Sequence, residues 1–413
     1  MGAERSERRV ITTEGKRTGK FTRARLFTCL TYFDKISIIY SMIEIQEAIS
    51  AKQKREFLNF PLKLYKGNDC FVPPLYGDEK KIFRANYHYY EQSEAVYYLA
   101  YENGKVVGRI SGILQRASNE KWGQKRVRFT RFDCIDDSAV AKALFAAVEG
   151  WAERRGMQEV VGPLGFSDLE REGLLIEGFD ELATFEEQYN FPYYQSLIES
   201  CGYEKDVDWL EHKLRLPKDP DPRYEKLATR IMERYHLHFS RTKNIRAFLK
   251  KHADDIFHLI DITYDEIYGT VPFTESMKKE LISSFKMIVD LRFVDVILDE
   301  NEKPVCFGLC LPSISRALQP SGGKLTLPTI FRVLKSVKNP QIIDLALIGV
   351  VPEYRMKGVS SVILYRLMQM LQTEGVEYCE TNLNLEDNYS ILNQWRAFDN
   401  VQHKRRRCFI KKL

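Results

Sequence analysis

The feature that most constrains this chain is a proline-rich segment near its middle. Residues Pro217 to Pro222 read Pro-Lys-Asp-Pro-Asp-Pro, which is typical of a linker. A chain of 413 residues is longer than one hydrophobic core usually serves, so two domains are the natural expectation. We therefore predict domains at 42–216 and 223–413, joined by a linker at 217–222.

Both halves are predicted to contain the same order of elements: a strand, two helices, a hairpin, and then alternating strands and helices. In the first half, Val96–Leu114 is predicted to form the hairpin and Ala139–Arg155 a helix. In the second half, the strand Ile342–Val350 precedes the helix Ser360–Thr373. Two domain-sized copies indicate an internal duplication rather than a solenoid.

Residues 1–41 differ in composition from both halves. Cations outnumber acids in the first 25 residues, and no helical or strand period is present. We predict a basic, disordered tail; the alternatives are an anchor to an anionic surface and a native start at Met42. The whole chain is 44% hydrophobic and 29% charged, with a net charge of +5, as in a globular protein that binds an anionic ligand or meets an acidic membrane.

No apolar run approaches the roughly 20 residues that span a bilayer. No apolar segment typical of a signal peptide occurs between Met1 and Lys20. We therefore expect a cytoplasmic protein, with a peripheral position at the inner membrane as a further option. The seven histidines show no metal-ligand spacing, and we expect no metal.

The stretch most informative about chemistry lies between a predicted strand and a helix. An apolar strand ends at Val350, a short polar loop follows, and the helix begins at Ser360. The N–H groups and dipole at a helix N-terminus bind phosphate. Gly358 lets a diphosphate approach the backbone, while Arg355 and Lys357 add positive charge. These residues predict an anion site, although an ordinary capped connection explains the same pattern.

This turn resembles the diagnostic motif of the GNAT acyltransferase superfamily, [Gln/Arg]-x-x-Gly-x-[Gly/Ala] after the fourth strand. The chain reads Arg355-x-x-Gly358-x-Ser360, and serine is a conservative departure at the last position. A second family element, an Asn that begins the helix after the fifth strand, corresponds to Asn388. The resemblance implies an α/β (α+β) fold of two tandem GNAT-like domains. Each would be a mixed, mostly antiparallel sheet flanked by helices, and the first would be degenerate.

The resemblance rests on these motifs for 222–413 and on element order alone for 42–216. The whole chain also resembles bacterial tandem-GNAT proteins of poorly defined substrate, some of which look like makers of N-acylated lipids. It implies an N-acyltransferase that moves an acetyl or longer acyl group from acetyl-CoA or acyl-CoA to an amine, by direct attack in a ternary complex. The acceptor would be a small-molecule or lipid amine. A non-catalytic protein that binds acyl-CoA or another ligand is the alternative.

The family's cofactor lies where the fourth strand splays from the next one. By this resemblance, the backbone N–H of Val350 would polarise the thioester carbonyl. No covalent enzyme intermediate is needed, but the amine must lose a proton. The expected cofactor-binding residues are Val350, Arg355, Met356, Lys357, Gly358, Val359, Ser360 and Asn388.

The catalytic acid departs from the family pattern. A Tyr commonly stands seven residues after the Asn, and this position is Trp395, which cannot protonate a thiolate in that way. As general base we predict Glu380, which shares a strand face with two asparagines, although a solvated carboxylate on an edge strand is equally compatible. The tyrosines that remain as candidate acids are Tyr389, Tyr378 and Tyr354.

The first half keeps the element order but loses the turn. Asp136 and Asp137 occupy the corresponding place, and they would repel a diphosphate, so we predict that this half binds no CoA. Its loops between Gly162 and Tyr194 combine glycines, acids and aromatics, as a ligand wall or an interface between domains would. A similar block, Tyr264–Thr274, lies where GNAT proteins place acceptor-binding helices.

Two basic segments allow more than one interpretation. Gly323–Lys338 is amphipathic, so it could lie on an anionic membrane face, cover an apolar acceptor, or pack onto its own domain. The run Lys404–Arg407 fits the 3′-phosphate of CoA, a phosphorylated acceptor or nucleic acid, and equally a strand edge guarded by charge. We expect no nucleic-acid partner, and the oligomeric state is not predicted.

Overall fold

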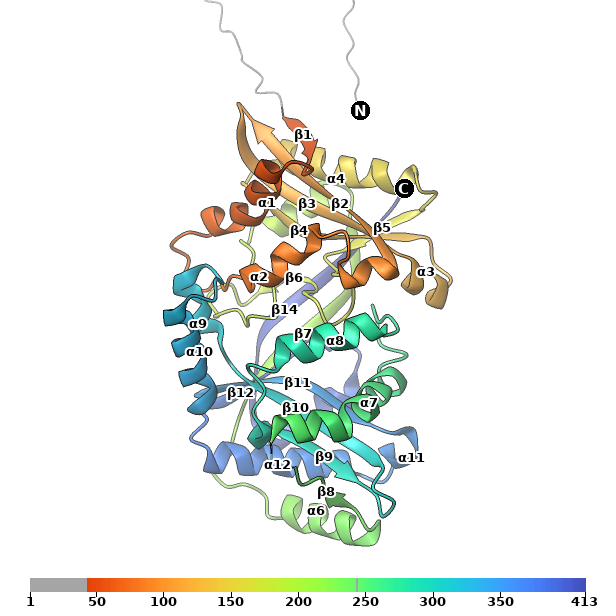
Figure 1. Ribbon diagram of the computed structural model, residues 1–413, viewed down its shortest axis with the longest axis vertical. Helices are drawn as coiled ribbons and strands as arrows, with labels where there is room; N and C mark the ends of the chain where they lie inside the picture. The colour runs from red at the N-terminus through yellow and green to blue at the C-terminus, as the bar shows by residue number, and fades with distance from the viewer. Residues whose placement is uncertain (1–42, 243) are drawn as a thin grey trace, which may run out of the picture. The chain divides into compact units, whose positions relative to one another are not determined.

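The computed structural model describes residues 43–242 and 244–413 (Figure 1). The predicted basic tail lies outside the described residues. Within them, 14 strands join into a single mixed sheet. The strands are β1 (Glu44–Glu47), β2 (Ser93–Glu102), β3 (Lys105–Gln115), β4 (Arg126–Cys134), β5 (Glu159–Gly162), β6 (Leu174–Glu177), β7 (Glu204–Arg215), β8 (His238–Phe239), β9 (Val294–Leu298), β10 (Pro304–Pro312), β11 (Ile342–Val350), β12 (Tyr378–Thr381), β13 (Asn384–Leu385) and β14 (Asp399–Lys412).

Helices connect these strands, and elements that the sequence did not indicate are added to the predicted order, among them the helix Arg223–Arg234 before β8. The α-helices are α1 (Ala51–Leu64), α2 (Tyr76–Glu79), α3 (Arg116–Trp122), α4 (Ser138–Glu153), α5 (Tyr194–Ser200), α6 (Arg223–Arg234), α7 (Ile245–Thr263), α8 (Glu275–Phe285), α9 (Ser315–Leu318), α10 (Leu327–Lys338), α11 (Pro352–Arg355), α12 (Ser360–Thr373) and α13 (Tyr389–Gln394). The 3-10 helices are η1 (Lys80–Phe83), η2 (His88–Glu91), η3 (Leu291–Phe293), η4 (Gln319–Ser321) and η5 (Trp395–Ala397).

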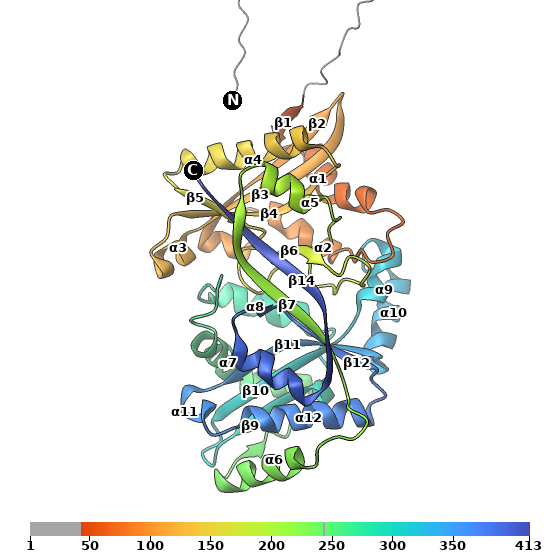
Figure 2. The ribbon, with the colours of Figure 1, turned by 180° about the vertical axis from the view of Figure 1, so that it is seen from behind.

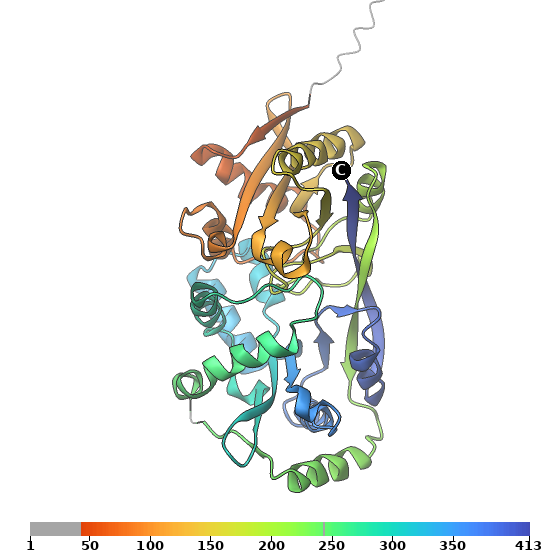
Figure 3. The same ribbon diagram turned by 90° about the vertical axis from the view of Figure 1, so that its right-hand side faces the viewer.

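The two halves exchange their last strands. The order along the sheet is β1-β2-β3-β4-β5-β14-β7-β12-β11-β10-β9-β8. The last strand of the second half, β14, thus lies between β5 and β7, and β7 lies beside β12 of the second half. Figures 2 and 3 show β7 and β14 running side by side from one half to the other. Because the sheet is continuous across the connection at 217–222, the division into 42–216 and 223–413 stays a prediction.

Helices cover both faces of each half, as the alternation of side chains along the strands requires. In the second half, Ile297 packs with α6 and α12, whereas Val296 and Leu298 pack with α7 on the opposite face. In the first half, Tyr98 packs with α4, whereas Leu99 packs with α1. Apart from two parallel strand pairs, β4–β5 and β11–β12, the sheet is antiparallel.

The C-terminal strand is much longer than its sequence pattern predicts. Only the last few residues look apolar enough for a strand, yet β14 begins at Asp399. Lys404 and Arg406 are completely buried, and their charges face carboxylates of β7 and β12. Buried ion pairs take the place of apolar side chains, so the hydrophobic period disappears.

The run Lys404–Arg407 is therefore neither a ligand site nor a solvated edge, and both interpretations are corrected. Each of its cations is held by acids of the chain itself. Lys404 contacts Glu380 and Glu211, Arg406 binds Glu211 at 2.6 Å, and Arg405 and Arg407 bind Asp208 at 3.1 and 2.8 Å.

Candidate functional site

A cleft opens beside β11, where the sequence predicts that two strands part. The parallel pairing of β11 with β12 runs from Ile342 opposite Tyr378 to Leu345 opposite Thr381. β12 then ends, whereas β11 continues to Val350. The unpaired part of β11 borders a cleft of about 1000 Å³, which is also lined by residues of α12 and α13.

The N–H of Val350 points into this cleft. Val350 lies opposite Cys306 of β10, and the next amide, that of Val351, donates to the carbonyl of Val305 at 3.0 Å. Hydrogen-bonded and non-hydrogen-bonded pairs alternate in an antiparallel ladder, so the amide of Val350 must face away from β10. This is the orientation that the predicted oxyanion donor requires.

The turn between β11 and α12 presents free N–H groups. The helix begins without a side-chain cap, and the amides of Gly358, Val359 and Ser360 donate to no residue in the described part of the chain. Gly358 has a φ of +77°, in the left-handed region that favours glycine, and a Cβ there would lie 3.2 Å from Ile231 of α6. Val359 buries its side chain and offers only its amide. Consecutive free amides at a helix N-terminus are typical of an anion site.

The side chains of this turn point in different directions. Arg355 lines the cleft, with its Nε 3.3 Å from the carbonyl of Val350. Met356 lies exposed on the rim. Lys357 instead places its ammonium 3.9 Å from the centre of the Tyr354 ring, outside the cleft lining. Arg355 is therefore the cation of this turn that faces the cleft.

Asn388 begins α13, as the sequence predicts, and lines the cleft. Its side chain accepts a hydrogen bond from the amide of Ile391 at 3.3 Å. Trp395 is buried in the cleft wall, where its indole N–H donates to Asn384 at 2.8 Å. Tyr389 is 68% exposed and does not line the cleft, so its assignment as a catalytic residue is corrected.

Glu380 also lies outside the cleft. Its buried carboxylate contacts the ammonium of Lys404, and its Oε1 is 3.3 Å from Nε2 of His403. Burial opposes the charged form, but Lys404 and then His403 outweigh it and lower the pKa of Glu380 to about 2. Such a carboxylate is a very weak base, so its predicted role is corrected. The prediction assumed that side chains alternate along one strand through Glu380 and the two asparagines. It fails because β12 ends at Thr381, and the chain turns into the cleft one residue later.

A tyrosine that the sequence did not single out reaches the open edge of β11. The hydroxyl of Tyr264 accepts a hydrogen bond from the amide of Ile348 at 3.1 Å and donates to the carbonyl of the same residue at 3.0 Å. Burial raises the pKa of Tyr264, so the hydroxyl keeps its proton. Tyr354 and Tyr378 do not line the cleft. The block Tyr264–Thr274 carried a signal, but sequence alone did not select this residue.

An apolar chamber of about 150 Å³ adjoins the cleft between α7, α8 and the sheet. Ala346, Leu347 and Asn382 line both spaces, so they meet at β11. The apolar wall of the chamber includes Phe248, Ile256, Phe257, Ile260, Leu281 and Ile282.

The first half supplies acidic residues to these two spaces. Asp168 and Glu187 line both the cleft and the chamber, Glu172 lines the cleft, and Glu186 lines the chamber. Burial raises the pKa of each: to about 6 for Asp168, about 7 for Glu186 and about 8 for Glu187. The loops between Gly162 and Tyr194 thus lie against the second half, as the interface alternative predicts, and the ligand wall stays a prediction.

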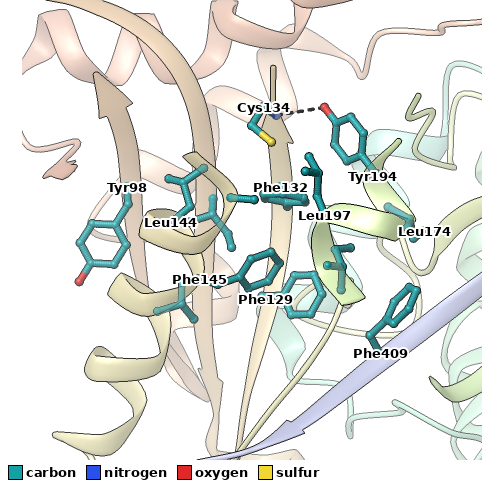
Figure 4. Close-up of a cluster of buried hydrophobic side chains, with 14 of the residues drawn as sticks. Tyr98, Phe129, Phe132, Cys134, Leu144, Phe145, Leu174, Tyr194, Leu197 and Phe409 are labelled. Atoms are coloured by element: carbon teal, nitrogen blue, oxygen red, sulfur yellow. Dashed lines mark hydrogen bonds between the residues drawn. The ribbon is translucent and has the colours of Figure 1, made fainter. Parts of the chain in front are cut away.

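The matching cleft of the first half is closed. Cys134 has the same ladder position as Val350, but its amide donates to the hydroxyl of the buried Tyr194 at 3.1 Å (Figure 4). The ring of Phe132 packs against that of Tyr194, with centroids 5.4 Å apart. At the start of α4, the carboxylate of Asp137 accepts hydrogen bonds from two helix amides. Side chains therefore occupy both the strand edge and the helix N-terminus that remain open in the second half.

Glu211, Glu380 and His403 bring three potential metal ligands within 4.8 Å of one another. However, the ammonium of Lys404 contacts Glu380 and lies 3.5 Å from Glu211. Lys404 thus already supplies the positive charge that a metal would bring. We interpret this group as an internal ion-pair cluster.

The fold defined by these features is that of tandem GNAT acyltransferases. The chain is similar to a tandem GNAT protein from the clavulanic acid biosynthesis pathway, with a TM-score of 0.51 and 13% identity over 90% of this chain and 98% of that one. It is also similar to the glucosamine N-acetyltransferase region of a fungal multi-domain β-N-acetylglucosaminidase, with a TM-score of 0.54 and 12% identity over 91% of this chain and 38% of that one. The predicted resemblance and fold class are confirmed.

Two relatives match almost end to end. The sequence is 24% identical to protein YghO of Escherichia coli over 379 residues, which are 89% of this chain and 95% of the relative. It is 24% identical to the bacterial ceramide synthase of Caulobacter vibrioides over 400 residues, 92% of this chain and 100% of the relative. No protein-family model matches the sequence. Among the described residues, no helix combines the length and the apolar character needed to cross a bilayer.

Proposed function

We propose that this protein is an N-acyltransferase that uses acyl-CoA and a long-chain amine as substrates. The observation that carries the proposal is the open edge of β11, which leads from free helix amides at one end to an apolar chamber at the other. A CoA diphosphate fits the amides and Arg355, and the pantetheine arm fits the strand edge. The relative named a ceramide synthase supports a lipid acceptor.

In this proposal each group of the cleft has a role that its position supports. The amide of Val350 faces the arm of the cofactor, where it polarises a carbonyl without reorganisation. Tyr264 holds its proton beside Ile348, where a departing thiolate would receive it. Trp395 and Asn388 form the wall on the α13 side.

Acyl-CoA binding without turnover is the second candidate function. It is favoured by Trp395, which stands at the position where the GNAT resemblance implies a proton-donating tyrosine and which donates its indole N–H to Asn384 instead. Release of CoA thiol separates the two functions. We expect the protein to release thiol from palmitoyl-CoA only when a long-chain amine such as dodecylamine is present, whereas a binding protein would release none with any amine.

The cofactor site is tested by Ser360→Asp, which places a carboxylate at the helix start as Asp137 does in the first half. An acid there suits the helix dipole, so the melting temperature should not fall. The carboxylate would repel the diphosphate, and we expect the Kd for CoA, measured by calorimetry, to rise at least about 10-fold, or about 1.4 kcal/mol. Ser360→Ala is the matched control and should bind like the unchanged protein. Equal affinity of both variants would place the diphosphate elsewhere.

We further propose that α10 rests on an anionic membrane. Leu327 and Phe331 are 75% and 72% exposed on this helix, and Lys324, Lys335 and Lys338 are exposed beside them. No acidic residue occurs between 324 and 338, so the charge of the segment complements anionic lipid. This arrangement is typical of a helix that lies in the interfacial plane of a bilayer.

The membrane contact is tested by the double change Leu327→Gln and Phe331→Gln. Each apolar side chain contributes about 1.5 kcal/mol or more when it leaves water. Partitioning onto phosphatidylglycerol vesicles, measured by sedimentation, should therefore fall by more than about 10-fold. Ile49→Gln is the matched control, because Ile49 is 69% exposed but lies near α1 rather than on α10. Equal partitioning of all three proteins would refute the role of α10.

A further inference from the structure

The acceptor side of the cleft carries two buried carboxylates, Glu187 and Glu172, each with an oxygen that lacks a hydrogen-bond partner among the described residues. The nearest cation to Glu187 is Arg406, whose Nε lies 4.0 Å from Oε2 without a hydrogen bond. Glu187, between β6 and α5, is 4% exposed and lines both the cleft and the chamber. Its Oε2 has no hydrogen-bond partner among the described residues, and the same is true of Oε1 of the buried Glu172. A buried polar atom without a hydrogen bond costs stability, so its retention beside a cleft indicates a ligand that completes the site.

A long-chain amine fits this arrangement of acids and apolar surface. Its alkyl chain would fill the chamber between α7 and α8, while its ammonium would remain at the acidic mouth beside β11. Ala346 and Leu347 line both spaces, so an ammonium at this mouth faces the strand edge along which the thioester is proposed to lie. A carboxylate offers both the charge and the acceptor atoms that an ammonium requires.

We propose that Glu187 accepts the proton of the acceptor's ammonium group, and that Glu172 and Asp168 bind this ammonium before the transfer. The inference rests on the proposed N-acyltransferase function and deepens it. The cleft of the first half that matches the proposed cofactor site is closed. In this proposal the first half instead supplies the residues that bind the acceptor, and the reaction takes place in the cleft of the second half. Glu187 would act directly on the substrate, and Asp168 and Glu172 would position it.

The surroundings of Glu187 suit a base that works near neutral pH. Burial raises the pKa of its carboxyl to about 8. Arg406 of β14 and Arg171 oppose this shift, whereas Glu211 of β7 and the adjacent Glu186 reinforce it. A proton acceptor is most effective when its pKa lies near the working pH. A bound ammonium favours the ionised form of the Glu187 carboxylate, so binding of the substrate promotes the basic form of this residue.

The proposed step balances in atoms and charge. The carboxylate of Glu187 takes one proton from R–NH3+, and the freed nitrogen lone pair forms a C–N bond at the thioester carbonyl. When the tetrahedral intermediate collapses, the C–S bond breaks and the thiolate of CoA takes the proton of Tyr264. The phenolate of Tyr264 recovers the second proton from nitrogen as the amide forms, and Glu187 releases its proton to water. The products are the amide, CoA and one proton.

The test is Glu187→Gln in the full-length protein, with palmitoyl-CoA and dodecylamine as probes. We expect kcat to fall by about 100-fold or more while the Kd for palmitoyl-CoA is unchanged. In the unchanged protein, the rate should rise with pH through about 8 as Glu187 ionises, and the variant should lack this limb. Glu199→Gln is the matched control, since Glu199 is exposed on α5 and lines neither the cleft nor the chamber.

A second acceptor separates proton removal from a structural role. O-dodecylhydroxylamine has the same chain length, but its nitrogen is already neutral at pH 7 and needs no base before attack. Glu187→Gln should therefore lose only a few-fold in rate with this probe. Equal losses with both probes, or equal losses in Glu187→Gln and Glu199→Gln, would overturn the inference. If the unchanged protein acylates neither probe, the proposed function itself is wrong.

Discussion

Replacement of Lys404 by methionine should lower the free energy of unfolding by about 3–5 kcal/mol. Lys404 is completely buried in β14, where its ammonium contacts Glu380 and lies 3.5 Å from Glu211. Methionine keeps much of the length but removes the charge, so two buried carboxylates lose their shared cation. Urea unfolding at pH 7 measures the change. Lys411→Met in the same strand is the matched control, since its pair with Glu149 is partly exposed and is worth less than about 1 kcal/mol.

The pH dependence gives this prediction a second readout. The pKa of Glu380 is about 2 in the folded protein, against an ordinary value of 4.5. Because the folded state binds this proton less readily, ionised Glu380 stabilises the protein above about pH 4.5, and the contribution is lost as the pH falls towards 2. Without Lys404, burial should raise the pKa of Glu380, and the variant should become more stable on mild acidification. A variant with unchanged stability and an unchanged pH profile would contradict the role of the cluster.

Separate production of residues 42–222 and 223–413 should yield two fragments that do not fold alone. The first fragment lacks β14, which lies between β5 and β7, and the second lacks β7, which pairs with β12. Each fragment would expose unpaired strand edges in the centre of its sheet, and such edges aggregate. We expect neither fragment to give a cooperative thermal transition, whereas the mixed fragments should recover one.

The control for this prediction is a protease site placed within 217–222 of the intact chain. Cleavage after folding should leave the two pieces bound together, because the exchanged strands rather than the connection hold the halves together. A fragment 223–413 that folds alone and binds CoA would show that the exchange is dispensable. In that case the domain boundaries predicted from the sequence would hold as folding units.

Local signals in the sequence were sufficient to place the turn that is proposed to bind the cofactor. The apolar run before Val350, the glycine at 358 and the helix start at Ser360 all occur where the pattern predicts them. Asn388 likewise caps α13. These features depend on neighbours within a few residues, and helix capping and hydrophobic period can be read from a sequence over that distance.

The proposed catalytic groups could not be selected in this way. Glu380 and Tyr389 looked suitable by spacing, yet one is tied to Lys404 and the other points to solvent. Tyr264 lies 84 residues before Ile348 of β11 in the chain, and Glu187 lies about 160 residues before this strand, yet both line the cleft. Their roles depend on which segments pack together, and no local period encodes that.

The sequence by itself indicated most of the helices and strands and the turn that is proposed to bind the cofactor, because hydrophobic period, glycine conformation and helix capping act over short distances. The GNAT pattern came from the resemblance of its motifs to that superfamily. Only the tertiary structure decided that β7 and β14 are exchanged, that Lys404 and Arg406 are core residues, and that acids of the first half reach the cleft of the second. These features arise from burial and pairing between distant segments, where the environment, and not the residue type, sets each charge and each partner.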